Sequence, residues 1–534
     1  MINRTHSIIG ITLTSALLLG ACSTGEADNQ GSQAPDEHTL TFAWPYDIGE
    51  MDPHVYVPSQ LFAQSMMYEP LVTYGEGGEL IPHLAESWDI SEDGLEYTFH
   101  LRDDVEFTNG TTFDADAVQS NFENILENID IHSWLGFIPK INDTEAVDEY
   151  TFKITLTEPY YPTLQELTVV RPVRFGDTNV QDLDPALQDI QKSVGTGPWI
   201  LDDYKVDEYA TFVRNDNYWG DLPEEESLTI KVIPDAETRV LAFEKGDVDL
   251  IYGEGIISLD SFKQLESTGE YKTSVSDPVA TRQLVMNTTK EQLSDERVRQ
   301  ALHYGFNKQG LVEGVTSGLE EAADYILPPN MPYTSNIDAT PIEYDPDKAI
   351  ELLEEAGWTL PNGSQVREKD GQPLEFELMY NSSESIQKTM AETLQSEWTA
   401  LGVKLDIVGI ELSTQIERFK ANDFDMNFFS NYGAPYDPHT FANIIATEGF
   451  GFNEAISSYE NKDEIIEQID TVLKSTDEEE REELYREILG SLQEQAAIVP
   501  ISYVNKIALY QEDISDFTFS PNRDEHSFSG IKRN

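Results

Sequence analysis

The chain has 534 residues, 39% of them hydrophobic and 10% aromatic, which is enough apolar material for well-packed interiors. Because a single hydrophobic core stops growing beyond about 250–300 residues, this length predicts two or more lobes. The 99 acidic and 34 basic residues give a formal charge of −65, which argues against nucleic acid and anionic lipid surfaces as partners. A salty or alkaline exterior is the simplest explanation of this acidity, which identifies no ligand.

The chain begins with a segment typical of an exported protein. Arg4 precedes the apolar run "IIGITLTSALLL" at 8–19, which is too short to span a bilayer. The run leads into "LGAC", where small residues precede Cys22, the only cysteine of the sequence. We expect 1–22 to be a signal peptide and the polar stretch 23–38 to be a flexible tether. A lone cysteine excludes a disulfide framework and a cysteine metal site.

Periodicity predicts alternating strands and helices in the first half of the chain. Alternation of apolar and polar residues indicates strands at 40–44, 97–107 and 151–156, the second turning near 102–104. Helical spacing is found at 113–126. Residues 237–253 predict a helix that ends at Gly246, followed by a strand over 248–252.

The second half repeats the order of helix followed by strand. In 385–410 one helical stripe ends at Gly402 and gives way to an alternating strand; the stripe contains Ile386, Met390, Leu394 and Leu401. Near the C-terminus, Thr476 and Glu479 predict a capping box that opens a helix with Leu484, Ile488 and Leu492 on one face. The recurrence predicts an α/β architecture, which commonly binds ligands in a crevice between lobes.

No enzyme motif stands out. The sequence contains no phosphate-cradling glycine loop, no G-x-S-x-G elbow and no H-E-x-x-H helix. Its nine histidines are scattered, and none are paired at the i, i+4 spacing of a helical metal site. A folded cleft could still bring several of them together, although a single histidine is more often structural than a ligand. We therefore predict a binding protein and no enzyme, since no nucleophile supports an extracellular hydrolase.

A run of segments follows a recognisable order along nearly the whole chain. They are "MMYEPLV" at 66–72, "LAESWDISEDGLEYTFHLRDDVEFTNGTTFDADAV" at 84–118, "GTGPW" at 195–199, "FEKGDVDL" at 243–250, "VRQALHYGFNKQGLV" at 298–312, "YDPDKAIELLEEAGW" at 344–358 and "VPISY" at 499–503. This order resembles the extracytoplasmic solute-binding proteins of the peptide/nickel family (family 5) of ABC importers. Independently of that family, "LGAC" resembles the lipobox of bacterial lipoproteins, which implies that Cys22 is lipidated and anchors the protein on the outer face of the cell membrane. An ordinary cleaved signal peptide is the alternative.

The resemblance implies an α/β, two-lobed, periplasmic-binding-protein-like (type II) fold. Lobe I would comprise 39–276 and 500–534, with an extra subdomain at about 81–197, and lobe II would comprise 277–499. Hinge crossings would join the lobes, which close over a small ligand. The implied partners are a membrane permease and a separate ATPase subunit, and the binding protein itself is expected to be a monomer.

Within the family, the nickel-binding branch gives the closer likeness, through segments such as "DPHVYVPSQLFAQSMMYEPLV", "HSWL", "EPYYPTLQELTVVRPVRF", "VRNDNYWG" and "GAPYDPH". Peptide binders of the family usually hold the peptide ammonium with an aspartate just before the D-P pair. Here Ala434 and Pro435 occupy that stretch. An ammonium brought out of water there would be uncompensated, which is costly. An oligopeptide or dipeptide binder of the same fold remains the alternative.

The segment "YGAPYDPHTF" at 432–441 predicts a stiff turn, because two prolines restrict its backbone and Gly433 permits a conformation that they cannot adopt. The resemblance places Tyr432 and Tyr436 in the cleft wall, with Tyr56 and Trp134 facing them from the other lobe. Ordinary core packing is the alternative for the tyrosines.

Arg171 matches an arginine that pairs with the carboxylates of a metal-bound organic chelator. A guanidinium grips a carboxylate through two parallel hydrogen bonds and keeps its charge, so the residue type suits that role. A structural salt bridge is the alternative for Arg171.

The chain also departs from the nickel-binding pattern. Ile131 replaces a second cleft arginine, and 442–455, where the metal-ligating histidine is expected, contain no histidine. Either His439, His132 or His526 substitutes as a metal ligand, or the chelator supplies every donor. Imidazole suits nickel, and a free chelator such as histidine can fill its coordination sphere. We therefore expect a complete nickel (or other transition-metal) chelate such as nickel–histidine, with His439 as the first candidate for a protein contact and a turn hydrogen bond as its alternative role.

Overall fold

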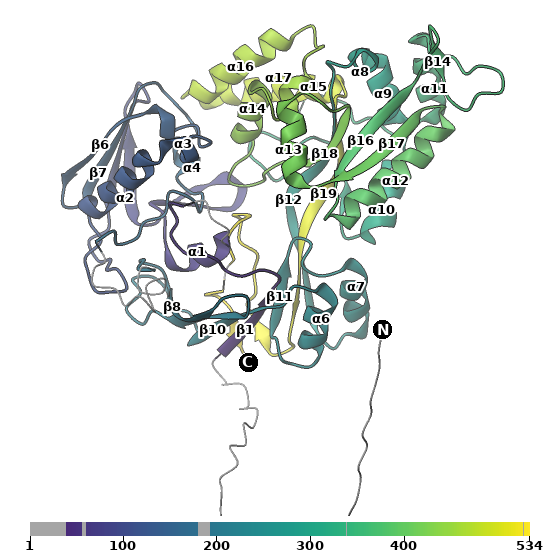
Figure 1. Ribbon diagram of the computed structural model, residues 1–534. Coiled ribbons are helices and arrows are strands. Elements are labelled where there is room, and N and C mark those ends of the chain that lie inside the picture. The colour runs from purple at the N-terminus through teal and green to yellow at the C-terminus, as the bar shows by residue number, and fades with distance from the viewer. Residues whose placement is uncertain (1–38, 56–59, 180–192, 338, 527) are drawn as a thin grey trace, which may run out of the picture. The chain divides into compact units, whose positions relative to one another are not determined.

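The computed structural model describes residues 39–55, 60–179, 193–337, 339–526 and 528–534. Its largest layer is an 11-stranded sheet that mixes parallel and antiparallel pairs (Figure 1). In spatial order the strands are β17 (Lys404–Ile410), β16 (Glu375–Asn381), β18 (Met426–Ser430), β12 (Lys272–Met286), β19 (Ile498–Tyr510), β11 (Leu250–Gly253), β1 (Thr39–Trp44), β10 (Ser227–Val232), β9 (Tyr209–Arg214) and β8 (Trp199–Lys205), and β13 (Glu321–Ala322) also pairs with β19.

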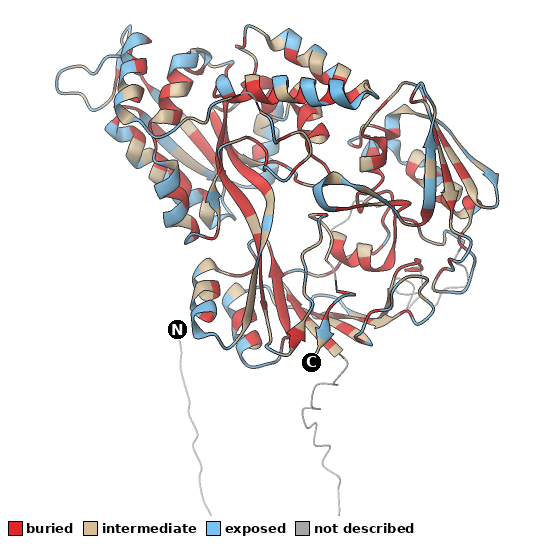
Figure 2. Ribbon diagram, turned by 180° about the vertical axis from the view of Figure 1, so that it is seen from behind, coloured by how far each residue is buried: buried red, intermediate tan, exposed pale blue. Residues whose placement is uncertain are grey.

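Strands β12 and β19 form the middle of this sheet and run antiparallel from one half to the other. Nearly every residue of β19 is buried (Figure 2). The pairing changes register between Val275 and Pro278, between Pro278 and Ala280, and between Arg282 and Gln283, and such irregularities bend and twist a strand pair. The predicted lobe boundaries, at 276/277 and 499/500, fall within these two strands and remain predictions.

A second, 4-stranded antiparallel sheet lies in the predicted subdomain. Helix α2 (Ala115–Glu127) packs on it, and the side chain of Asp114 accepts a hydrogen bond from the Ala117 backbone, which caps the helix. The strands in spatial order are β4 (Ala85–Ile90), β5 (Glu96–Leu101), β7 (Thr151–Leu156) and β6 (Ile141–Asp148). Three two-stranded sheets complete the strands: β2 (Val72–Tyr74) with β3 (Leu80–Pro82), β14 (Glu368–Lys369) with β15 (Gln372–Pro373), and β20 (Ile514–Ser515) with β21 (Lys532–Arg533).

Most helices expose one face and bury the other against the sheets or one another (Figure 2). Besides α2, the described α-helices are α1 (Leu61–Met67), α3 (Ile129–His132), α4 (Thr163–Glu166), α6 (Ala236–Glu244), α7 (Leu259–Thr268), α8 (Glu291–Ser294), α9 (Glu296–Tyr304), α10 (Lys308–Thr316), α11 (Pro346–Glu355), α12 (Ser385–Ala400), α13 (Leu412–Lys420), α14 (His439–Ala446), α15 (Phe452–Ala455), α16 (Lys462–Lys474) and α17 (Glu478–Glu494). Among the described helices, none combines the length and apolar character that crossing a membrane requires.

The largest hydrophobic cluster joins parts of the chain that lie far apart in sequence. It contains Phe122 and Phe152 of the subdomain together with Phe441 of α14 and Ile488 of α17. Apolar burial is the main favourable term in folding, so this shared core supports the placement of the subdomain against helices α14–α17. A separate cluster, which includes Trp398, fills the space between the sheet and α9–α12.

The structure confirms most of the predicted elements and corrects some boundaries. The strand predicted at 248–252 begins later, as β11 at Leu250. In α12 the buried face contains Met390, Leu394 and Trp398, whereas Ile386 is half-buried and Leu401 lies beyond the last helical residue. The predicted Thr476–Glu479 capping box is wrong: Asp477 caps α17 and accepts hydrogen bonds from the backbone of Glu479 and Glu480. A carboxylate one residue later gives the same cap with added favourable charge at the helix N-terminus.

Gly433 offers a test of the turn that follows β18. Its φ is +77°, and a Cβ atom added there would lie 2.1 Å from the Val279 carbonyl oxygen. We expect Gly433→Ala to lower the free energy of unfolding by more than the roughly 1–2 kcal/mol of left-handed strain alone, because the backbone must also move. Chemical denaturation measures the change. Gly269→Ala is the control, since Gly269 has a φ of +67° and open space around it; equal losses in the two variants would contradict the close contact.

Candidate functional site

The turn between β18 and α14 folds around one carboxylate. Asp437 accepts hydrogen bonds from the Gly433 backbone at 2.6 Å, the Asn431 side chain at 2.7 Å and the Phe441 backbone at 3.2 Å. Burial raises the pKa of Asp437 to about 7, against the opposing effect of the bond from Gly433. The predicted stiffness of 432–441 therefore comes from this buried carboxylate as well as from the prolines.

Three predicted site residues lie together beside this turn. The ring centroids of Trp134 and Tyr436 are 6.1 Å apart, and those of Tyr432 and Tyr436 are 6.3 Å apart. Tyr436 is buried, whereas Trp134 is 41% and Tyr432 37% exposed. The structure thus brings Trp134, Tyr432 and Tyr436 into one aromatic cluster, with a buried central ring and two partly exposed outer rings that could contact a flat ligand.

Arg171 lies on the segment that follows α4. Its Nη1 donates to the Val55 carbonyl oxygen at 3.2 Å, and its charge contributes to the lowered pKa of His132, two residues before Trp134. The side chain is half-buried. Tyr56 and Cys22, two further predicted residues, lie outside the described residues.

Residues 522–525, near the C-terminus, hold both sides of this region. Arg523 donates to the carbonyl oxygens of Asn431 at 3.1 Å and Tyr432 at 2.9 Å, and to Glu254 at 2.6 Å. The Tyr436 hydroxyl donates to Asp524. Glu525 accepts from Arg174, three residues after Arg171. Nothing in the local sequence signals this role, because each partner lies far away along the chain.

Two of the candidate metal-ligating histidines are buried and neutral. Burial, with the nearby charge of His54, lowers the pKa of His132 to about 4, and His132 hydrogen-bonds the His54 backbone. Burial lowers the pKa of His439 to about 3. The His439 Nε2 lies 3.8 Å from the Glu166 carboxylate, too far for a hydrogen bond.

The third candidate, His526, lies within an aromatic core. Its ring centroid is 4.2 Å from that of Tyr252 and 4.4 Å from that of Phe62, and it stacks on Phe528. Burial lowers its pKa well below the usual value. Within the described ranges, no group of three or more histidine, cysteine, aspartate or glutamate side chains is arranged to hold a metal ion. His132, His439 and His526 therefore do not belong to one group of side chains that could coordinate a metal ion together.

Comparisons with known proteins agree with this fold. A family model described as "Bacterial extracellular solute-binding proteins, family 5 Middle" matches residues 79–453. The nickel-binding periplasmic protein of Escherichia coli (strain K12) is 42% identical over 500 residues, which are 93% of this chain and 95% of that protein. The crystal structure of NikA from Brucella suis in complex with Fe(III)-EDTA superimposes with a TM-score of 0.89 at 41% identity, covering 93% of this chain and 100% of that one. The dipeptide-binding protein of Escherichia coli (strain K12) is 27% identical over 490 residues, 87% of this chain and 88% of that protein.

These findings define an extracytoplasmic solute-binding protein of the ABC-importer type, a class whose members bind small ligands for transport and are not enzymes. More specifically, the chain belongs to family 5 of the bacterial extracellular solute-binding proteins. The resemblance read from the sequence and the expected type II α/β fold are confirmed.

Glu166 allows a test of the buried charges beneath the turn. Burial raises its pKa to about 7, although it accepts hydrogen bonds from the Phe137 backbone and the Tyr160 hydroxyl. The folded protein therefore binds a proton more tightly than the unfolded chain, so this group's stability contribution is full below about pH 4.5 and is lost as the pH rises through about 7.

We expect Glu166→Gln to remove that loss, so that the variant's melting temperature falls less than that of the wild type between pH 6 and pH 8. In the steepest part, the free energies of unfolding of the two proteins should diverge by on the order of 1 kcal/mol per pH unit. Thermal unfolding across pH measures it, with the exposed Glu417→Gln as control. Parallel pH profiles for wild type and Glu166→Gln would show that Glu166 ionises normally.

Proposed function

We propose that the protein binds a nickel chelate, or the chelate of another transition metal, and delivers it to its importer. The observation that carries the proposal is the aromatic cluster of Trp134, Tyr432 and Tyr436, with the charge of Arg171 close to His132, in a region where the described residues form no group of metal ligands. Ring faces pack on a flat chelate, and a guanidinium holds its anionic edge. The 42% identity to a nickel-binding protein and the likeness to a structure containing Fe(III)-EDTA support a metal-chelate cargo.

Peptide cargo is the second candidate, and the relatives that bind dipeptides motivate it. A peptide needs a carboxylate for its ammonium. Asp437 is already occupied by three hydrogen bonds within the turn, and Ala434 and Pro435 bring no charge. Asp524 is an acid beside the cluster, and it accepts a hydrogen bond from the Tyr436 hydroxyl. The arrangement favours the chelate.

Calorimetric titration of the purified, metal-stripped protein separates the two candidates. The ligands are nickel alone, nickel with histidine, and a mixed pool of short peptides. We expect saturable binding of nickel with histidine, and binding of nickel alone at least tenfold weaker, because the chelator brings the donors. Heat from the peptide pool without any from nickel–histidine would replace the first candidate with the second.

Arg171 should contribute to affinity and little to stability. We expect Arg171→Ala to weaken nickel–histidine binding more than tenfold, about 1.4 kcal/mol or more, because the anionic edge of the chelate loses its partner. The melting temperature of the ligand-free protein should change by only a few degrees. The control is Arg486→Ala, at a side chain on the outer face of α17 that contacts Glu483; equal affinities for the Arg171 variant and this control would remove Arg171 from the site.

We further propose that Cys22 is lipidated and tethers the chain to the outer face of the cell membrane through 23–38. The expected result is incorporation of a palmitate analogue into the wild-type protein in growing cells and none into Cys22→Ser, with the variant released into the soluble fraction. Labelling of both proteins, or release of both, would contradict the anchor. Light scattering during size-exclusion chromatography of the soluble form tests the expected monomer.

A further inference from the structure

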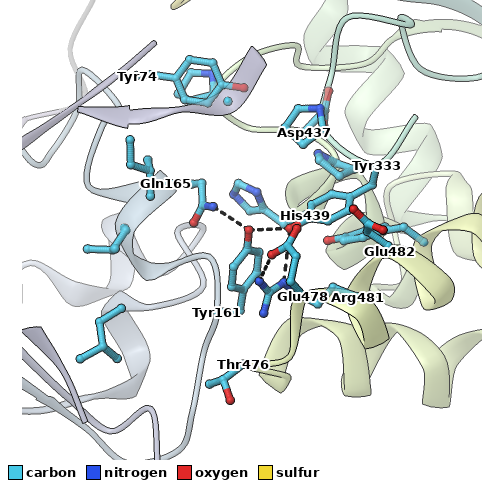
Figure 3. A pocket seen from close by; sticks show the side chains of 18 of the residues that line it. Tyr74, Tyr161, Gln165, Tyr333, Asp437, His439, Thr476, Glu478, Arg481 and Glu482 are labelled. Carbon is cyan, nitrogen blue, oxygen red and sulfur yellow. Dashed lines mark hydrogen bonds and ion pairs between the residues drawn. The ribbon is translucent and has the colours of Figure 1, made fainter. Parts of the chain in front are cut away.

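A cavity of about 770 Å³ borders the 432–441 turn (Figure 3). It shares Pro435, Asp437, Pro438 and His439 with the turn, but it is lined by none of Trp134, Arg171, Tyr432 and Tyr436. Its remaining walls come from the β2–β3 and β4–β5 hairpins, the segment around α4, residues 332–333 and the first turns of α17 with Thr476 before them. The volume is in the range of small-molecule sites.

In the wall of the cavity, the side chain of Arg481 lies against an aromatic ring. The Arg481 guanidinium lies 3.6 Å from the ring centroid of Tyr161, and Arg481 donates to the Ser475 carbonyl at 2.8 Å and to the Tyr333 hydroxyl at 3.3 Å. Tyr333 in turn stacks on Tyr485 with centroids 4.7 Å apart. The wall therefore has tyrosine faces, which attract cations.

Three polar atoms of the lining have no hydrogen-bond partner within the described chain. They are the Tyr485 hydroxyl, on a side chain that is 1% exposed, the Gln165 Oε1 and the Nε2 atom of the neutral His439. The amide nitrogen of Gln165 donates to the Tyr161 hydroxyl at 3.0 Å. The amide oxygen can only accept, so it needs a donor. Leaving such groups unsatisfied costs about 1–3 kcal/mol each, so a ligand that donates N–H groups would relieve that cost.

The charge of the lining favours a cation as well. Glu92, Glu478 and Glu482 are exposed at the cavity. Arg481 is the one lysine or arginine among the described lining residues, and its Nη2 contacts Glu478. His439 is neutral, because burial lowers its pKa to about 3. The carboxylates of Glu92 and Glu482 therefore have no cationic partner among the described residues that line the cavity.

We propose that this cavity is a second ligand site, for a small organic cation that carries N–H donors, that is, a primary ammonium or a guanidinium. The tyrosine faces attract the charge, Gln165 Oε1 and the Tyr485 hydroxyl accept N–H bonds, and Glu92 and Glu482 neutralise the ligand at the opening. The proposal does not depend on nickel-chelate binding, since the aromatic cluster and Arg171 lie outside the cavity lining.

Calorimetric titration of the metal-stripped mature protein tests this chemistry. The probes are putrescine and agmatine, with tetramethylammonium as a cation that has no N–H group and succinate as an anion. We expect saturable one-to-one binding of putrescine or agmatine, at least tenfold weaker binding of tetramethylammonium, and none of succinate. Equal binding of all three cations, or no saturation by millimolar putrescine and agmatine, would overturn the proposal.

Variants then locate the binding. We expect Tyr485→Phe and Glu482→Gln each to weaken binding at least fivefold, with no loss of melting temperature for Tyr485→Phe, because its hydroxyl has no partner to lose. Glu464→Gln, an exposed change on α16 outside the lining, is the control and should bind as the wild type does.

Nickel–histidine separates this site from the proposed function. Arg171→Ala should bind putrescine and agmatine unchanged, and saturating nickel–histidine should not displace them. Displacement, or loss of binding in Arg171→Ala, would instead assign the organic cation to the aromatic cluster and overturn the second site, whatever the cargo of that cluster is.

Discussion

Arg523 is the residue on which the geometry of the site depends most. Its backbone nitrogen donates to the carbonyl oxygen of Ala434 and its guanidinium to those of Asn431 and Tyr432, while Glu254 balances its charge. Buried charge is tolerable only when it is paired and fully hydrogen-bonded, and Arg523 meets this condition only if the turn has its present shape. The following residue, Asp524, then fixes the hydroxyl of Tyr436. One short C-terminal segment thereby sets the positions of two aromatic rings.

The same segment explains how the two sides of the region are kept in register. Glu525 pairs with the buried Arg174, and the Asn522 amide donates to the Thr168 carbonyl oxygen at 3.3 Å, so the loop that carries Arg171 is tied to the residues that tie the turn. A cationic fork and a set of ring faces can recognise one ligand only if their spacing is fixed before the ligand arrives. Shared attachment to 522–525 supplies that spacing.

Sequence periodicity predicted the elements well where local physics decides them. Asp114 at the start of α2 and Gly402 after α12, with a φ of +84°, are local solutions to helix capping, and both can be read from a few neighbouring residues. The capping box at Thr476 was wrong because Asp477 offers a competing acceptor one residue later, and local pattern alone does not rank the two. The site is a different case. The resemblance brought attention to Trp134, Arg171, Tyr432 and Tyr436, but no pattern pointed to Arg523 or Asp524, because with 99 acidic side chains any partner for a cation is plausible from sequence.

The histidines show why residue type alone is a weak guide to metal binding in this chain. Burial keeps His132 and His439 neutral, the form that ligates metals, yet His132 is engaged with the His54 backbone and His526 is enclosed by rings. A ligand must present its nitrogen to a shared point with other donors, and the described residues do not converge in that way. Selectivity for a metal would then have to be exercised on the shape and charge of a chelate already assembled outside the protein. Under the proposed function, the identity of the chelator, more than that of the metal, should therefore govern affinity.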